Sequence, residues 1–245
     1  MESQIKVAVI TGASRGIGAA IAERLARDGF AVIVNYAGRT AEAEATVRRI
    51  ESAGGKAVAV QADVGSIDGA RRLFDAAQAH FGGVDVVVNN AGIMRLSPIG
   101  ETSEADFDAQ IATNLKGTFN MLREAAARLR DGGRIINLST SVIGLNLPGY
   151  AAYAAGKAGV EALTRIMAQE MRGRGISVNA VAPGPTATDL FLDGKSPELV
   201  DQLARRAPLE RLATPDDIAG TVAFLAGADG GWINGQVIRA NGGIV

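Results

Sequence analysis

Tyr153 and Lys157 are the two residues whose types and spacing most directly suggest chemistry. They lie four positions apart within residues 150–172, a stretch that reads as a long helix, so we expect both side chains on one helical face. An unperturbed tyrosine titrates at about pH 10, too high for easy proton exchange at neutral pH, and a nearby ammonium group favours the phenolate. We therefore predict that Lys157 lowers the pKa of Tyr153 and makes it a usable acid and base. The alternative is an ordinary amphipathic helix whose lysine extends to solvent.

A glycine-rich turn near the start of the chain suggests phosphate binding. The β-branched residues 7–10 read as a buried strand, and Gly12, Gly16 and Gly18 lead into a helix that carries residues 19–27. Such glycines let the backbone turn sharply and approach a ligand closely, and the free N–H groups of the helix start attract anions. The spacing is G-x-x-x-G-x-G rather than the commonest dinucleotide fingerprint, so a tight structural turn is the alternative for this stretch alone.

Strand-like and helix-like stretches alternate along the rest of the chain. We expect further strands at residues 31–35, 56–61, 84–88, 134–138, 176–181 and 236–239. We expect further helices at residues 40–52, 66–81, 104–130, 150–172, 196–206 and 215–225. This alternation predicts an α/β fold in which a doubly wound parallel sheet carries helices on both faces, in a single domain over residues 1–245.

Polar and glycine-rich residues gather where these strands end. They occupy residues 12–18, 35–39, 63, 89–92, 139–141 and 183–188. Ligands of doubly wound sheets bind beyond the carboxyl ends of the strands, so these separate loops should converge on one crevice. That convergence favours a functional site over a set of unrelated structural turns.

Composition narrows the class of protein further. Apolar residues make up 47% of the 245 and charged residues 21%, which suits a packed core rather than a disordered chain. The net charge is −1 without a basic run, and there is no cysteine. We therefore expect no nucleic-acid partner, no disulfide and no metal site. A core strand starts within the first few residues and no apolar stretch could span a bilayer, so we expect a cytoplasmic protein with no membrane partner.

The chain resembles the short-chain dehydrogenase/reductase family in five motifs that occur in order. They are Thr-Gly-Ala-Ser-Arg-Gly-Ile-Gly at 11–18, Asn-Asn-Ala-Gly at 89–92, Asn114, Tyr-Ala-Ala-Gly-Lys at 153–157 and Pro-Gly at 183–184. The resemblance covers essentially the whole chain and is greatest to the branch that contains 3-oxoacyl-carrier-protein reductases and hydroxynaphthalene reductases. It implies a seven-stranded sheet of the Rossmann type and hydride transfer between a nicotinamide cofactor and a carbonyl or alcohol.

The resemblance also gives roles to residues around Tyr153. It implies that Lys157 binds the nicotinamide ribose as well as tuning the tyrosine. It further implies that Asn114 opens its helix locally and holds a water that passes protons to Lys157, and asparagine is indeed a poor residue for a helix interior.

One position departs from the family pattern. The serine that would hydrogen-bond the substrate carbonyl falls on Thr140 in this chain. A threonine hydroxyl can donate the same bond, although its side chain is stiffer. The flanking Ser139 and Ser141 are the alternatives for this role, and all three could instead cap the strand end.

Cofactor choice rests on the end of the second predicted strand. An acidic residue there would bond the adenosine ribose and select NAD. The position that carries it in NAD-dependent relatives is Tyr36, and residues 35–39 contain no acid, whereas Arg15 and Arg39 can meet a 2′-phosphate. We therefore expect NADP. The expected cofactor-binding residues are Gly12, Ser14, Arg15, Gly16, Ile17, Gly18, Asn35, Tyr36, Arg39, Asp63, Val64, Asn89, Ala91, Gly92, Tyr153, Lys157, Pro183, Gly184, Thr186 and Thr188.

Residues 186–208 are placed to cover the site as a mobile lid that excludes water. Their apolar members Leu190, Phe191 and Leu192 are candidates for lining the substrate pocket, together with Ser139 and Ser141. The resemblance also implies a homotetramer packed through the two long helices and the C-terminal segment.

The leading interpretation is an NADPH-dependent reductase of a ketone or 3-oxoacyl-type carbonyl, with Tyr153 as proton donor. One alternative is an NAD-dependent alcohol or sugar dehydrogenase, and another is a cofactor-binding regulator without chemistry. The substrate itself is not readable from the sequence, because an apolar lid accepts many small carbonyl compounds.

Overall fold

The core of the protein is a seven-stranded parallel sheet, seen in a computed structural model that describes residues 5–245. The strand order is β3-β2-β1-β4-β5-β6-β7, and every neighbouring pair is parallel. The strands are β1 (Val7–Ile10), β2 (Ala31–Tyr36), β3 (Lys56–Gln61), β4 (Val84–Asn89), β5 (Leu129–Leu138), β6 (Ser177–Pro183) and β7 (Val237–Ala240). The order reverses direction between β1 and β4, which is the switch point where ligands bind in such sheets.

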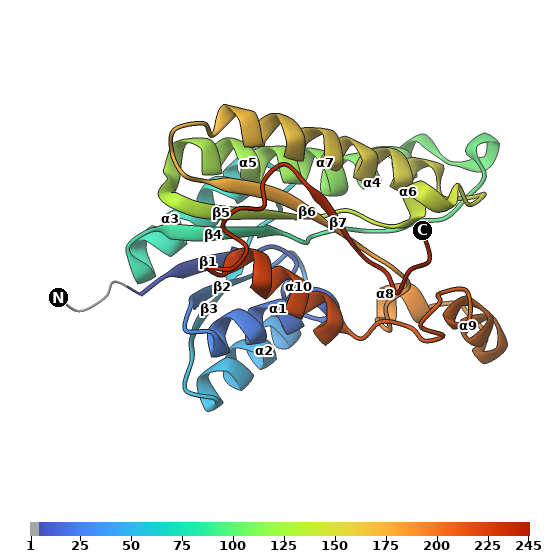
Figure 1. Ribbon diagram of the computed structural model, residues 1–245, viewed down its shortest axis with the longest axis horizontal. Helices are drawn as coiled ribbons and strands as arrows, with labels where there is room; N and C mark the ends of the chain where they lie inside the picture. Colours follow the sequence, from blue (N-terminus) through green and yellow to red (C-terminus); the bar gives the residue numbers. More distant parts are fainter. Residues whose placement is uncertain (1–4) are drawn as a thin grey trace.

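Helices cover both faces of this sheet (Figure 1). One layer holds α1 (Gly16–Arg27), α2 (Thr40–Ser52) and α10 (Pro215–Ala226). The opposite layer holds α3 (Ile67–Phe81), α4 (Glu104–Ile111), α5 (Gly117–Arg128) and α7 (Ala151–Glu170). The doubly wound fold and the seven strands expected from the sequence are confirmed.

The β1 strand shows why an uninterrupted apolar run specifies a central strand. Its successive side chains point to opposite faces, so both faces must be apolar when both are covered. Ala8 and Ile10 belong to the core against α1 and α10, whereas Val7 and Val9 belong to the core against α3, α5 and α7. All four residues are fully buried.

The predicted continuous helix over residues 104–130 is wrong in two respects. A π-helical turn (Ala112–Lys116) separates α4 from α5, and Leu129 already begins β5. The side chain of Asn114 explains the interruption, because its amide bonds both main-chain groups of Ile93, at 2.8 Å each, instead of facing solvent. Such a bond competes with regular helix geometry.

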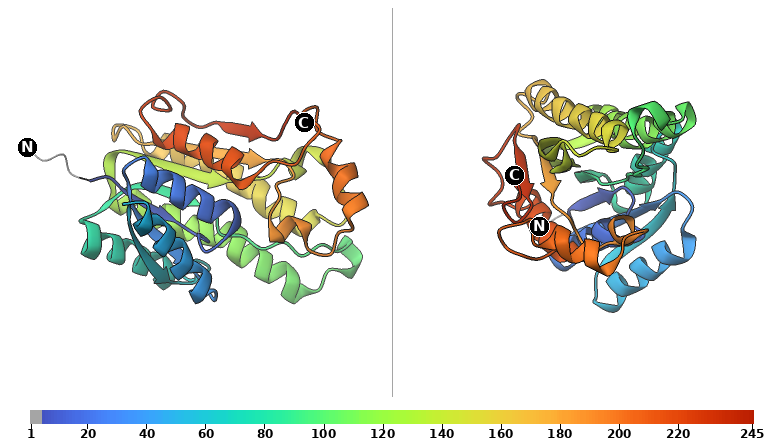
Figure 2. Two further views of the ribbon diagram at one scale, coloured as in Figure 1. Left: turned by 90° about the horizontal axis from the view of Figure 1, so that it is seen from below. Right: turned by 90° about the vertical axis from the view of Figure 1, so that its right-hand side faces the viewer.

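Short elements that the sequence did not reveal lie at the carboxyl ends of the strands. They are the 3-10 turn η1 (Ile99–Glu101), α6 (Val142–Leu145) and α8 (Asp189–Leu192). The next helix, α9 (Pro197–Ala204), corresponds to the helix expected at residues 196–206. Figure 2 shows α8 and α9, in orange, grouped at one end of the molecule beyond the sheet. Within residues 5–245, no helix is both long and apolar enough to cross a membrane.

Candidate active site

The turn between β1 and α1 forms one wall of a cavity of about 430 Å³. Its glycines are required by close packing: a Cβ on Gly18 would lie 2.3 Å from the carbonyl oxygen of Gly12. Gly12 itself has φ +64, and a Cβ there would lie 2.8 Å from the Cα of Ala91. Within residues 5–245 no side chain caps the start of α1, so its first N–H groups are available to an anion.

Two side-chain amides, of the buried Asn35 and the half-buried Asn90, hold this turn in place. Asn35 accepts a hydrogen bond from Gly12 N at 3.1 Å and donates one to Ala62 O at 2.9 Å, so it joins the ends of β1, β2 and β3. Asn90 donates from its amide nitrogen to the carbonyl oxygens of Thr11 and Gly12, at 2.9 and 3.0 Å. The turn is therefore preorganised before any ligand binds.

Charged groups gather at the end of this cavity beside β2. Arg15 and Arg39 both line it, and the segment from Asn35 to Arg39 brings no carboxylate to the wall. The Arg15 guanidinium pairs with the Asp189 carboxylate of α8 at 2.8 Å, while Arg39 pairs with Glu42 at 3.0 Å. Both pairs are largely exposed, so they are weak and open to exchange for a phosphate. These donors fit a dinucleotide with a 2′-phosphate.

A second cavity, of about 150 Å³, adjoins the first. The two share Ile17, Asn90, Gly92 and Thr188 in their walls. Tyr153, Lys157 and Thr140 line the second cavity near this junction, so a reactive atom of a bound cofactor could meet a substrate there.

The three hydroxyl residues after β5 face different partners. Ser139 donates to the Glu161 carboxylate at 2.7 Å, and Ser141 donates to Ala182 O at 3.1 Å while accepting from Asn241 at 3.0 Å. The Thr140 hydroxyl accepts a hydrogen bond from Val142 N at 3.3 Å, and Thr140 is the one of the three that lowers the pKa of Tyr153. All three line the second cavity together with Tyr153.

The predicted direction of the pKa shift at Tyr153 is wrong for the protein without ligand. Burial raises the pKa of Tyr153 to about 12, and the hydrogen bond with Thr140 acts in the opposite direction with a smaller effect. The Lys157 ammonium lies 6.0 Å from the centre of the tyrosine ring. Burial also lowers the pKa of Lys157 to about 8, so near neutral pH the lysine holds its proton less firmly than an exposed one.

Lys157 is fixed at the floor of the cavity. Its ammonium donates to Leu138 O at 2.6 Å, and the residue is 4% exposed. Gly92 lies beside it: a Cβ there would be 3.7 Å from the Lys157 nitrogen and 3.2 Å from the Asn114 amide oxygen. The structure thus brings Asn114, Tyr153 and Lys157 together from the π-helical turn and α7.

All of the expected cofactor residues except Asn89 line one of the two cavities. Asn89 is buried and donates to Asn137 at 2.8 Å, and its amide oxygen finds no hydrogen-bond partner within residues 5–245. Its neighbour Asn90 lines both cavities instead. The alternation along β4 could have revealed this, because Asn89 shares a strand face with the core residue Val87. The placed residues are Gly12, Ser14, Arg15, Gly16, Ile17, Gly18, Asn35, Tyr36, Arg39, Asp63, Val64, Ala91, Gly92, Tyr153, Lys157, Pro183, Gly184, Thr186 and Thr188.

The segment 186–208 contributes differently from the sequence expectation. Phe191 lines the second cavity as predicted for a substrate contact. Leu190 lines the first cavity instead, and Leu192 is 38% exposed and belongs to neither lining. In a helix as short as α8, consecutive side chains point in different directions, so three adjacent leucine and phenylalanine residues cannot face one pocket.

Sequence reasoning missed several residues of the second cavity. They come from the short helices α6 and α9, from loops and from the C-terminal segment, and no motif marks them: Met94, Val142, Leu145, Leu147, Tyr150, Pro185, Leu203, Arg206 and Ile244. The first cavity likewise gains Ala37, Gly38, Ala62, Ile93, Thr113, Ala187 and Asp189.

Comparison with known proteins shows the family to which the chain belongs. A family profile described as enoyl-(acyl carrier protein) reductase matches residues 12–245. The chain is 44% identical to an NADPH-dependent aldehyde reductase-like chloroplastic protein of Arabidopsis thaliana, over 98% of this chain and 94% of the relative. It is 45% identical to a 3-oxoacyl-[acyl-carrier-protein] reductase of Staphylococcus aureus, over 98% of each chain.

A solved structure shows the same fold. The short-chain dehydrogenase from Burkholderia cenocepacia, solved in complex with NADP, is 37% identical and superposes with a TM-score of 0.92. The match covers 98% of this chain and 97% of that one. These similarities extend over nearly the whole length of the chain, and the glycine turn and the Tyr153–Lys157 pair are consistent with them. The chain belongs to the short-chain dehydrogenase/reductase family of NAD(P)-dependent oxidoreductases.

Proposed function

We propose that this protein is an NADPH-dependent reductase of a ketone or 3-oxoacyl-type carbonyl. The observation that carries the proposal is that Thr140, Tyr153 and Lys157 line one cavity, with the Lys157 ammonium 6.0 Å from the centre of the Tyr153 ring, and that this cavity shares part of its wall with the cavity of the glycine turn. Two hydroxyl groups at one point are suited to binding and protonating one oxygen atom. The names of the 44% and 45% identical relatives, an aldehyde reductase-like protein and a 3-oxoacyl reductase, support a carbonyl as the group that reacts.

NADP is the cofactor that we propose. The acid-free segment after β2 and the guanidinium groups of Arg15 and Arg39 support it, because a guanidinium fork matches a phosphate and a ribose diol needs a carboxylate. The relative from Arabidopsis thaliana is named NADPH-dependent, and the structure from Burkholderia cenocepacia contains NADP. When bound, the reduced cofactor would supply a hydride to the carbonyl carbon.

The residues of this chain then act on the carbonyl oxygen. Thr140 donates a hydrogen bond that polarises the carbonyl, and Tyr153 gives its proton to the same oxygen. A raised pKa keeps Tyr153 protonated at neutral pH, which suits a proton donor. The protonated form of Lys157 stabilises the negative charge that develops on the tyrosine. Asn114 holds the π-helical turn open beside Lys157, where water can return the proton.

The first experiment is a titration of the purified protein with NADPH and with NADH, followed by nicotinamide fluorescence. We expect tight binding of NADPH and weak binding of NADH. Arg15→Ala should weaken NADPH about tenfold or more and leave NADH little changed, because it removes charge-assisted hydrogen bonds to the phosphate. Arg27→Ala, an exposed arginine at the other end of α1, is the matched control. A preference for NADH would favour the alcohol or sugar dehydrogenase.

The second experiment is a screen of ketones, aldehydes and 3-oxoacyl thioesters, with and without an acyl carrier, for NADPH oxidation. Reduction of any carbonyl class supports the proposal. Tight NADPH binding without turnover of any carbonyl would instead favour a cofactor-binding regulator. Reduction of only a conjugated C=C bond would contradict the proposal that the C=O group is the one reduced.

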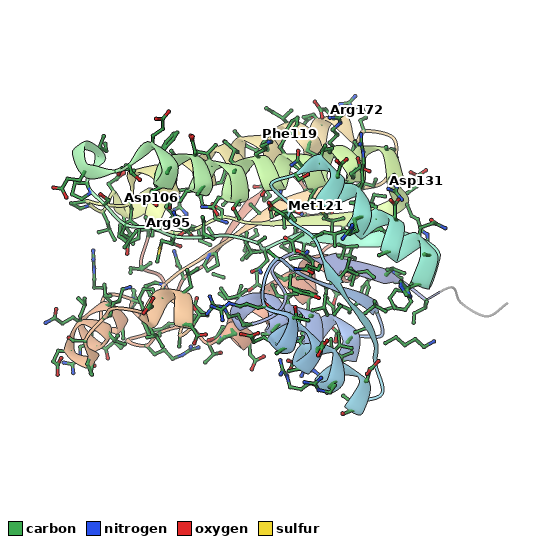
Figure 3. The ribbon with its side chains drawn as sticks, turned by 180° about the vertical axis from the view of Figure 1, so that it is seen from behind. Arg95, Asp106, Phe119, Met121, Asp131 and Arg172 are labelled. Carbon is green, nitrogen blue, oxygen red and sulfur yellow. The ribbon has the colours of Figure 1, made fainter. Side chains whose placement is uncertain are left out.

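We also propose that the whole chain acts as one domain and assembles as a homotetramer, with residues 186–208 as a lid. Exposed apolar side chains on the outer helices support assembly: Phe119 of α5 is 50% exposed and Ile166 of α7 is 56% exposed. Figure 3 shows Phe119 on the outer side of the helical layer. Trp232 in the C-terminal segment is 99% exposed. Light scattering during size-exclusion chromatography tests this, and a monomer at micromolar concentration would contradict it.

A further inference from the structure

A guanidinium group lines the substrate cavity without a role in the chemistry just described. Lys157 and Arg206 are the only charged residues among the described residues that line this cavity. Lys157 is buried at the floor and bonded to Leu138 O, whereas Arg206 comes from the segment after α9 and is exposed. The two cations therefore belong to different parts of the cavity, and only the first is explained by proton transfer.

The local backbone places Arg206 in the wall of the cavity. α9 ends at Ala204, and the N–H of Arg206 bonds Leu203 O at 3.3 Å in the turn that follows. Ala207 is 3% exposed, so the chain is anchored directly after the arginine. Leu203 and Arg206, three positions apart, line the cavity together.

The neighbouring arginine shows that this orientation is particular to position 206. Arg205 pairs with Asp201 along α9 at 2.8 Å and does not line the cavity. Within residues 5–245, Arg206 forms no ion pair, and no aspartate or glutamate side chain lines the cavity. Arg206 is therefore a cationic residue of the cavity lining that has no carboxylate partner among the described residues.

Apolar side chains make up much of the rest of the cavity lining. Leu145, Phe191, Leu203 and Ile244 all line the same cavity. A ligand that fits would therefore carry its carbonyl at one end, an apolar body in the middle and a group that accepts hydrogen bonds from a guanidinium at the other. A planar guanidinium binds carboxylate and phosphate groups in a fork, and both are anionic.

We propose that Arg206 binds an anionic group, a carboxylate or a phosphate, at the end of the substrate remote from its carbonyl. The substrate class is then an oxo compound with an apolar middle and a terminal anion, and Arg206 is its specificity-determining residue. This inference rests on the proposed carbonyl reductase function, because that function places the other end of the substrate at Thr140 and Tyr153.

The test uses straight-chain oxo acids of increasing length, each with its methyl ester, and the matching oxo phosphates. Binding is measured by calorimetry with the full chain in the presence of NADP⁺, which has no hydride to transfer, so that the ketone stays intact. We expect the anionic compounds of one chain length to bind about fivefold to tenfold more tightly than the neutral ester, and the advantage to shrink with added salt. The comparison between carboxylates and phosphates of equal length identifies which anion is preferred.

Arg206→Ala should remove the preference for the anion, and Arg206→Glu should reverse it in favour of an amino ketone of the same length. Arg205→Ala is the matched control, because it removes the same charge one residue away from the cavity, and it should keep the wild-type preference. The same ratio is then measured in turnover, where the change should appear in KM rather than in kcat.

The outcomes separate the two proposals. Equal binding of acid, phosphate and ester at every length, or a preference that survives Arg206→Ala, would overturn the role of Arg206 and leave the reductase standing. A preference that Arg206→Ala removes, in a protein that reduces none of these ketones with NADPH, would support the anion site and count against the reductase.

Discussion

The cavity beside α1 and the cavity beside α7 share four residues but are built from different parts of the chain. The first contains a glycine turn that a single Cβ would obstruct, held by the amides of Asn35 and Asn90. Residues from β5, α7, α9 and the C-terminal segment contribute to the second. Of the residues that the structure describes, Tyr153 and Lys157 are the two strongly shifted titratable groups in these linings, and both belong to the second cavity.

The two cavities should therefore respond differently to substitutions in their walls. A main-chain cradle depends on backbone positions, so most side-chain changes leave its shape unaltered, whereas a side-chain pocket changes with each residue that lines it. The substrate cavity should therefore be open to redesign, and the cofactor cavity should tolerate almost no change at its glycines.

Tyr153→Phe should have a large effect on catalysis and almost none on cofactor binding. The variant keeps the ring and loses the proton donor, so kcat for carbonyl reduction should fall about a thousandfold. The affinity for NADPH should stay within about twofold of wild type because the glycine turn is untouched. Steady-state kinetics and nicotinamide fluorescence measure the two effects, and substantial residual turnover would remove Tyr153 from its assigned role.

Lys157→Met should change how stability depends on pH. Burial lowers the pKa of Lys157 to about 8 in the folded chain, against the ordinary lysine value of 10.5 in the unfolded chain. Between these values the unfolded state binds more protons, so the stability of the wild type should rise with pH from about 8 to about 10.5. The rise attributable to this group is on the order of 3 kcal/mol.

Urea unfolding of wild type and Lys157→Met across this pH range measures the effect, because the other groups cancel in the difference. Arg165→Met, a cation farther along α7 whose side chain lines neither cavity, is the control. A pH-independent difference between wild type and Lys157→Met would show that the lysine titrates normally.

Thr140→Ala and Thr140→Ser test which hydroxyl holds the carbonyl oxygen. Ser139 and Ser141 are engaged with Glu161 and with Ala182 and Asn241, so they should not replace a missing Thr140 hydroxyl. Thr140→Ala should lower kcat about a hundredfold, the usual cost of one donor to a developing oxyanion. Thr140→Ser should retain most of the activity, and Ser141→Ala serves for comparison. Equal losses in Thr140→Ala and Ser141→Ala would count against this choice.

Gly18→Ala should distort the glycine turn in the wall of the first cavity. Its Cβ would lie 2.3 Å from Gly12 O and 2.5 Å from the Asn90 amide nitrogen, so the turn must shift. We expect a loss of about 1–3 kcal/mol in the free energy of unfolding and at least about tenfold weaker NADPH binding. Gly100→Ala, where no atom lies within 4 Å of the added Cβ, is the control. Wild-type NADPH affinity in Gly18→Ala would argue that the turn is not the phosphate site.

Asp189→Asn should give the smallest effect, and in the favourable direction. The Asp189 carboxylate pairs with Arg15 in the free protein and competes with a phosphate for that guanidinium. The pair is exposed and worth at most about 1 kcal/mol, so NADPH should bind up to about fivefold more tightly to the variant and NADH about as before. Weaker NADPH binding would mean that Asp189 helps to hold the cofactor instead.

The sequence predicted features of this protein that are encoded locally. Residues 7–10 are apolar throughout and three of the four are β-branched, which suits a central strand covered on both faces, and the strand lies where it was expected. The G-x-x-x-G-x-G turn and the spacing of Tyr153 and Lys157 placed the residues of both cavities, because a helix brings positions four apart to one face.

Other features depend on contacts between distant segments. Asn114 signalled a disturbed helix, but the bonds to Ile93 that produce the π-helical turn join residues 21 positions apart. Arg206 and Ile244 enter the substrate cavity from segments with no motif, and Leu190 and Leu192 stay out of it because a short helix turns them away.

The order of elements, the glycine turn and the spacing of Tyr153 and Lys157 could be predicted from the sequence, since period, turn chemistry and spacing are properties of neighbouring residues. Packing across the fold is what engages Ser139 with Glu161 and Ser141 with Ala182 O, and what buries Tyr153 so that its pKa rises. Burial and hydrogen-bond partners come from elements that pack together across the fold, so no local pattern contains them.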